Sequence, residues 1–157
     1  MTATTNAALS GIDSPYSSAV SSQVGTLANG AVLFTIAGGP IQILSLISVC
    51  TLVNGAAATT IQYSSTPTVG SATTFSGASG SLLSVAAGTT VLLTPTALST
   101  APVIVLAAAG GVQLGLVAQN HIIVLAGTIT SVVTNASTGA WTHYLNYIPL
   151  APGVTVV

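Results

Sequence analysis

The most conspicuous absence in this sequence is electrical charge. Its 157 residues include no lysine, no arginine and a single acidic residue, Asp13. Charged residues normally make up about a quarter of a soluble domain. Because no cationic side chain is present to neutralise phosphates, we expect no binding to nucleic acid. A single carboxylate also cannot supply the pair of acids that glycoside hydrolysis requires.

The residues that carry most enzyme chemistry are equally scarce. A phosphate-binding P-loop needs a lysine, and no G-x-S-x-G nucleophile motif occurs. The two histidines, His121 and His143, fall short of the three or four ligands of a zinc site. We therefore expect no catalytic activity, no cofactor and no metal ligand within one chain. Two interpretations of the histidines stay open: hydrogen-bonded structural residues, or an ion site formed by several copies on a symmetry axis.

Long hydrophobic runs are also missing, although the mean hydropathy is +0.89. The two longest apolar stretches are Ile41–Val53 and Ala101–Ala118. The first contains 13 residues, whereas a spanning helix needs about 20. The second is interrupted by three glycines and Gln113, and no basic residue flanks either stretch. We expect no membrane span.

Cysteine and aromatic residues are rare. The only cysteine, Cys50, cannot form a disulfide within the chain, and its apolar neighbours predict a small buried hydrophobic residue. Aromatic residues make up 4% of the chain, with one tryptophan, Trp141. We expect Trp141 to anchor a core or an interface.

What the sequence has instead is short apolar segments with a period of two, rich in β-branched residues. Turn-forming glycine, proline and asparagine separate most of them. We predict strands over Ala31–Ile36, Ile41–Val53, Thr59–Ser64, Ser81–Val85, Thr90–Thr94, Val103–Ala107, Val112–Gln119, His121–Leu125, Gly127–Thr134, Trp141–Ile148 and Val154–Val157. Strands spaced at this interval predict an all-β fold, an antiparallel, jelly-roll-like β-sandwich. We expect one such domain over residues 26–157 and an extended N-terminal arm over residues 1–25.

Two predicted strands are apolar enough to have partners on both faces. In Ile41–Val53 strict alternation places Ile43 and Ile47 on one face, and Leu44 and Leu46 on the other. Such a strand belongs in the middle of a sandwich or at a subunit interface. The strand Trp141–Ile148 alternates in the same way. Our candidates for core or interface residues are Ile43, Leu44, Leu46, Ile47, Trp141, Tyr144 and Tyr147.

The loss of charge has a physical use in a subunit that packs beside identical copies. Neutral neighbours do not repel one another, and a net charge near zero favours association. Contacts would then come from apolar area and backbone hydrogen bonds, so assembly should depend little on salt. With so few titrating groups, stability should also vary little with pH. We therefore expect a homo-oligomer.

The C-terminal third carries a family resemblance. The segments His121–Ile129, Thr138–Trp141 and Tyr144–Val156 look like the ending of small virion proteins of tailed bacteriophages. Ala31–Ile36 followed by Ile41–Leu52 is similar to the opening hairpin of the same proteins. The resemblance implies a structural β-sandwich protein that decorates or cements the capsid, or builds a spike or fibre, often as a homotrimer. The near-total loss of charge departs from that family.

On this basis we expect a virion protein located on the capsid surface, whose partners are other copies and the major capsid protein or another virion protein. The arm would reach onto a neighbour or the shell. One alternative is a tail-tip or fibre module that binds host glycan, with Trp141, His143 and Asn146 as the clearest group. Another is a subunit of an extracellular filament or surface layer. The sequence leaves open the head or tail location, the copy number and which sheet face meets a partner.

Overall fold

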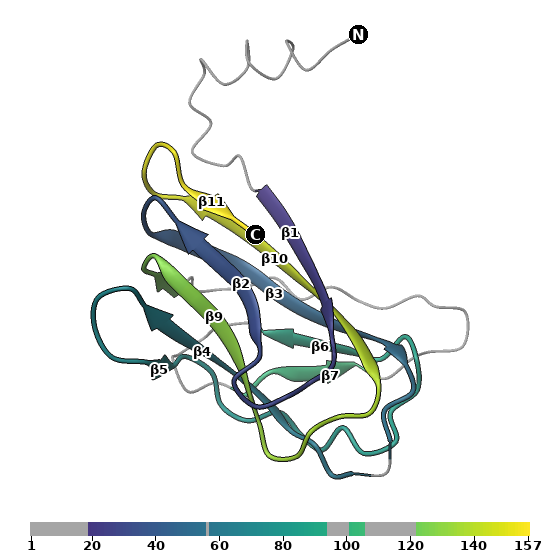
Figure 1. The fold of residues 1–157 in the computed structure, drawn as a ribbon. Helices are drawn as coiled ribbons and strands as arrows, with labels where there is room; N and C mark the ends of the chain where they lie inside the picture. Colours follow the sequence, from purple (N-terminus) through teal and green to yellow (C-terminus); the bar gives the residue numbers. More distant parts are fainter. Residues whose placement is uncertain (1–18, 56, 94–100, 106–121) are drawn as a thin grey trace, which may run out of the picture.

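The structure is a computed structural model that describes residues 19–55, 57–93, 101–105 and 122–157. These residues form strands and connecting turns, and no helix occurs among them. Figure 1 shows the chain path. The strands are β1 (Ala19–Gly25), β2 (Val32–Ala37), β3 (Ile41–Leu52), β4 (Ile61–Pro67), β5 (Thr73–Thr74), β6 (Thr90–Leu93), β7 (Val103–Val105), β8 (Ile122–Val124), β9 (Gly127–Val133), β10 (Ala140–Pro149) and β11 (Thr155–Val156).

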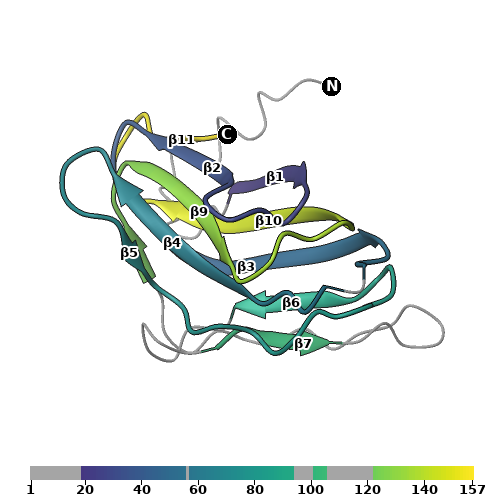
Figure 2. The same cartoon turned by 60° about the horizontal axis from the view of Figure 1, so that its bottom comes forward.

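The strands form two antiparallel sheets, as the sequence predicted. The first sheet has the order β1-β10-β3-β6-β7, with β8 also paired to β3, and the second has the order β11-β2-β9-β4-β5. Consecutive strands cross repeatedly from one sheet to the other, as they do in a jelly roll. The two sheets lie as two layers, which Figure 2 shows from the side. The fold is a β-sandwich.

The core lies between the two layers and contains side chains from both. Period-two alternation places one set of residues from each strand inward, because successive side chains in a strand point to opposite faces. In the second sheet this set is buried on β2, β4 and β9: Phe34, Ile36, Ile61, Tyr63, Ile129 and Val133. In the first sheet it comes mainly from β3 and β10: Ile41, Ile43, Leu46, Cys50, Trp141, Leu145 and Tyr147.

A β-bulge in β3 corrects the predicted face assignment. Ser45 pairs with Asn146 and Ile43 pairs with Tyr147, so Leu44 is an extra residue without an opposite partner. The bulge shifts the alternation by one residue. Ile43 and Leu46, which strict alternation placed on opposite faces, are therefore both buried in the core. An unbroken apolar run gives no local sign of a bulge, so the sequence pattern did not predict this one.

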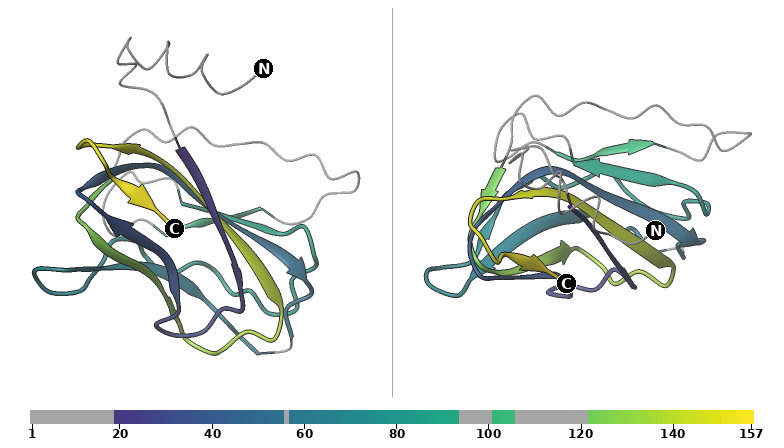
Figure 3. Two further views of the ribbon diagram at one scale, coloured as in Figure 1. Left: turned by 45° about the horizontal axis from the view of Figure 1, so that its top comes forward. Right: turned by 90° about the horizontal axis from the view of Figure 1, so that it is seen from above.

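Two further predictions differ from the structure at individual segments. The predicted strand Ser81–Val85 is a loop, although Leu82 and Val85 are buried. Ser84 has a positive φ of 51° within it, a conformation that a regular strand does not contain. Residues 19–25, which we expected to belong to the arm, form strand β1 on the margin of the first sheet (Figure 1, Figure 3). The rest of the arm, residues 1–18, and the predicted strand Val112–Gln119 lie outside the described residues.

Candidate functional site

The candidate core and interface residues separate into two groups on the first sheet. Four of them face the core and are buried: Ile43, Leu46, Trp141 and Tyr147. On the outward face, Tyr144 is 39% exposed and pairs across the strands with Ile47, which is half-buried. Leu44, in the bulge, is also half-buried. The first group builds the sandwich, and the second contributes to the outer face of the first sheet.

A polar cluster lies in the core between the sheets. Ser48 on β3 and His143 on β10 are opposite each other in the strand register, and Ser48 Oγ lies 2.6 Å from His143 Nδ1. Ser48 Oγ also lies 2.9 Å from the hydroxyl oxygen of Tyr63 on β4, in the opposite sheet. All three side chains are fully buried. The cluster therefore joins the two layers by hydrogen bonds between buried side chains.

Burial also fixes the protonation of this cluster. Desolvation lowers the pKa of His143 to about 4, because a buried imidazolium loses its hydration. Desolvation raises the pKa of Tyr63, and its hydrogen bond with Ser48 only partly opposes this shift. The imidazole and the phenol are therefore both neutral at pH 7. A serine beside a histidine is also the arrangement of a nucleophile and its base, but no substrate reaches a fully buried Ser48 Oγ. The cluster is structural.

The structure corrects the residue group that we associated with glycan binding. Trp141 and His143 are fully buried, and Asn146 is half-buried with an enclosed side-chain oxygen. Glycan recognition needs an exposed aromatic ring, so these residues form no such surface. Because His143 is fully buried, it is not available as a ligand for an ion on a symmetry axis between copies. The other candidate ligand for such an ion, His121, lies outside the described residues.

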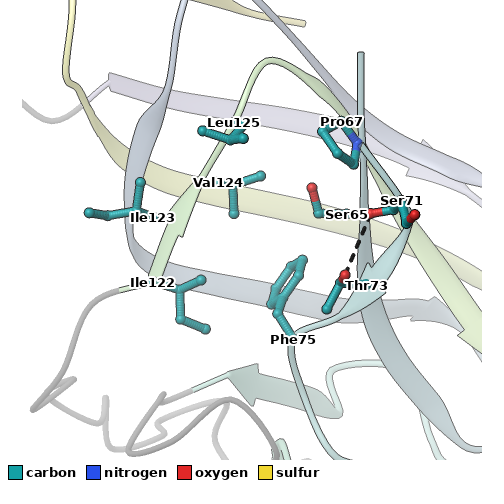
Figure 4. Close-up of a pocket in the computed structure, with 9 residues that line it drawn as sticks. All are labelled: Ser65, Pro67, Ser71, Thr73, Phe75, Ile122, Ile123, Val124 and Leu125. Carbon is teal, nitrogen blue, oxygen red and sulfur yellow. Dashed lines mark hydrogen bonds between the residues drawn. The ribbon is translucent and has the colours of Figure 1, made fainter. Parts of the chain in front are cut away.

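An apolar groove lies beside the β4–β5 hairpin (Figure 4). One side of the groove comes from Ser65, Pro67, Ser71 and Thr73, and the other from β8 and the residue after it. Phe75 lies between the two sides in Figure 4. The groove has a volume of about 190 Å³ and is lined by Ser65, Pro67, Ser71, Thr73, Phe75, Ile122, Ile123, Val124 and Leu125.

A second hollow adjoins this groove, since Pro67 and Leu125 line both. It has a volume of about 240 Å³, and it also contacts Val69 and the turn at Gly39. Neither hollow has a charged group, and each is smaller than the 300–1,000 Å³ of typical small-molecule sites. Their chemistry suits apolar side chains of another protein better than a polar ligand.

Sequence reasoning missed this groove because its position depends on the β4–β5 hairpin. The strand β8 was predicted, and its alternation is visible in the sequence. Ile122 and Val124 are buried, whereas Ile123 is 63% exposed and Leu125 is 54% exposed. Four consecutive apolar residues of which two face outward would have been a signal for a contact surface.

The described surface has a simple chemical character. None of the described residues is Lys, Arg, Asp or Glu, because Asp13 lies outside them. No group of histidine, cysteine or acidic residues that could hold a metal ion occurs in this part of the chain. The same residues include no helix of the length and hydrophobicity needed to cross a membrane. Cys50 is a buried free thiol, as its apolar neighbours predicted.

Comparisons of this chain with protein-family models, with curated proteins and with solved structures found no match.

Proposed function

We propose that this chain is a structural subunit of a tailed-bacteriophage virion, which decorates or cements the capsid as a homo-oligomer. Its role is to add contacts between neighbouring protein subunits, and no chemical transformation is part of it. Its partners are other copies of the chain and the major capsid protein or another virion protein. A trimer is the arrangement that the family resemblance implies.

The observation that carries the proposal is a sandwich surface without charged side chains that exposes many large apolar ones. Monomeric proteins usually keep a net charge for solubility and avoid apolar patches. Here the exposed large apolar residues are Val32, Leu52, Val53, Val69, Leu83, Ile123, Leu125, Tyr144, Leu150 and Val157. Three of them, Val69, Ile123 and Leu125, line the two adjoining hollows. Such a surface suits a subunit held by apolar contacts.

The virion assignment rests on the resemblance of the sequence segments together with the fold. The resemblance implies a β-sandwich, and the chain folds as one. The described residues also offer no accessible acid, base or nucleophile pair, since the one serine–histidine contact is buried. Both observations favour a structural role over an enzyme.

Immunogold electron microscopy of phage particles tests the location. An antibody against the folded chain should label many sites over the head. Label confined to the tail tip would favour the fibre alternative instead. Absence of the chain from purified particles, measured by mass spectrometry, would overturn the virion assignment.

A further inference from the structure

Strand β1 is the one long strand on the margin of either sheet among the described residues. It contains seven residues and pairs with β10 on one side only. The other marginal strands are short: β5 and β11 have two residues each, and β7 and β8 have three each. Short edge strands are one of the ways in which proteins avoid pairing with other chains. β1 lacks that protection.

The sequence and register of β1 also lack three other devices that guard a sheet edge. Its sequence, Ala-Val-Ser-Ser-Gln-Val-Gly, contains no charged residue and no proline. Its register with β10 runs from Ala19 opposite Tyr147 to Gly25 opposite Trp141 without a shift, so no bulge turns the edge away. Charges, prolines and bulges are the usual means of blocking edge-to-edge pairing. Among the described residues only β10 pairs with β1, which lies on the margin of the first sheet (Figure 1, Figure 3). The backbone N–H and C=O groups on the other side of β1 therefore offer a template for another strand.

The residue order of β1 is self-complementary when read in both directions from Ser22. In an antiparallel pair of identical strands centred on Ser22, each valine, Val20 or Val24, faces the other valine of the second copy. Ser21 then faces Gln23, and the small residues Ala19 and Gly25 face each other. Cross-strand pairs of β-branched residues and of polar residues stabilise a sheet. No other centre within β1 pairs both valines with valines.

We propose that two copies of this chain pair through β1, antiparallel and about a two-fold axis at Ser22. The pairing joins the first sheets of the two copies, each of six strands, into one continuous sheet. The contact is isologous, because the same surface of each copy meets itself. The main-chain hydrogen bonds supply much of the contact, and the valine and polar pairs set its register.

This inference rests on the self-association in the proposed function, but not on the virion location. An isologous contact links two copies and does not close a ring of three. If the copies also form trimers, the β1 contact connects one trimer to the next. The β1 contact and any contact within a trimer are therefore tested by separate experiments.

Charge substitutions at the paired valines test the register. Val20→Lys combined with Val24→Lys places lysine opposite lysine at both ends of the contact, and should weaken the pairing at least tenfold, that is by about 1.4 kcal/mol or more. Val20→Lys combined with Val24→Glu places lysine opposite glutamate and should restore it. The readout is the weight-average mass by light scattering as a function of concentration, with far-UV circular dichroism to verify folding. Equal dimerisation by the two folded variants would overturn the proposal.

Cysteine substitution tests the same contact independently of its strength. Ser22→Cys places two thiols directly opposite each other at about 4.5–5.5 Å between Cα atoms, within the range of a disulfide. Mild oxidation should give a covalent dimer. The matched control is Val20→Cys, whose two copies stand about 13 Å apart along the paired strands, and it should stay uncrosslinked. Adding Val24→Cys to that control should restore crosslinking. The buried Cys50 does not compete.

The results separate the two proposals. A wild-type chain that remains monomeric at all concentrations would overturn both the β1 contact and the homo-oligomer. A stable oligomer in which Ser22→Cys does not crosslink, and in which the double lysine variant keeps its mass, would overturn the β1 contact alone. A Val20→Cys variant that crosslinks as well as Ser22→Cys would show a different register and would also overturn it.

Discussion

Ser48 Oγ and His143 Nδ1 lie 2.6 Å apart at opposite positions of β3 and β10, in the buried centre of the sandwich. The two residues are 95 positions apart in the chain, so their contact forms only when the first sheet is assembled. Because Ser48 also contacts Tyr63 of the second sheet, one hydroxyl connects both layers. We therefore expect the stability of the fold to depend on pH and on substitutions at this cluster.

Acidification should destabilise the protein through His143. Its pKa is about 4 in the folded chain and near 6.5 when unfolded. Above pH 6.5 both states are neutral. As pH falls from 6.5 to 4, the imidazole becomes protonated in the unfolded state but stays neutral in the folded state. The free energy of unfolding therefore decreases by about 3 kcal/mol over this range and levels off below pH 4. Denaturant unfolding at a series of pH values measures this loss.

The chain offers a clean control for that prediction, because it has so few titrating groups. His143→Gln should remove most of the decrease between pH 6.5 and pH 4, whereas His121→Gln should leave it in place. An equal pH dependence in the His143→Gln variant would show that another group is responsible. The near-absence of charge predicted little pH dependence, and the burial of His143 restricts that expectation to pH values above about 6.5.

Removing the shared hydroxyl should cost more than removing one of its partners. Ser48→Ala leaves the Tyr63 hydroxyl and His143 Nδ1 buried without this partner, so we expect a loss of about 2–4 kcal/mol in the free energy of unfolding. Tyr63→Phe keeps the contact between Ser48 and His143 and should cost about 1 kcal/mol. Urea denaturation at pH 7.5 compares the two. A larger loss for Tyr63→Phe than for Ser48→Ala would contradict the central position of Ser48.

A second buried polar residue, Asn54, connects the loops at one end of the sandwich. Its Nδ2 donates to the Leu82 carbonyl oxygen at 2.7 Å, and its Oδ1 accepts from Ser137 Oγ and the Gly139 N–H. Asn54→Ala should lower the free energy of unfolding by about 2–3 kcal/mol, because it leaves several buried groups unpaired. Ser137→Ala removes the hydrogen bonds of the Ser137 hydroxyl with Asn54 and Gly139, but Asn54 Oδ1 still accepts from the Gly139 N–H and Asn54 Nδ2 still donates to Leu82. This variant leaves these groups paired and should therefore cost less. Thermal unfolding of both variants checks the order, and equal melting temperatures would refute it.

Gly127 at the start of β9 should not tolerate a side chain. It has a φ of +151°, and a Cβ there would lie 2.6 Å from Pro67 Cα on the neighbouring strand. Gly127→Ala should therefore destabilise the chain by more than about 2 kcal/mol through strain and backbone displacement. Gly25→Ala is the matched control, since a Cβ at that position meets nothing within 4 Å. Chemical denaturation should show little change for Gly25→Ala, and a similarly mild effect at Gly127 would contradict the close approach.

The sequence predicted the fold class because alternation and turn residues are local signals. The strand β10 keeps the predicted alternation, and the structure buries the face that contains Trp141 and Tyr147, a choice of face that the sequence left open. In β3 the alternation fails at Leu44, since a bulge there depends on the partner strand. β1 was missed because its small and polar residues have no apolar periodicity, and only pairing with β10 makes it a strand.

The candidate residues were predictable only in part. Burial of Trp141 and Tyr147 follows from their size and from the alternation of their strand. The contact of Ser48 with His143 could not be predicted, since it depends on the register of two strands far apart in sequence. The same holds for the groove at Phe75, which requires the β4–β5 hairpin to lie beside β8. Local patterns define strands, whereas sites depend on how the strands pair.

The native mass of the purified chain across a range of salt concentrations tests the central claim most directly. Raising NaCl from about 0.01 M to about 1 M at neutral pH shortens the Debye length from about 30 Å to about 3 Å. A chain whose described surface lacks charged side chains, and which associates through apolar area and backbone pairing, should keep the same oligomeric mass throughout. A monomer at every concentration, or an oligomer that dissociates over this range of salt, would contradict the account.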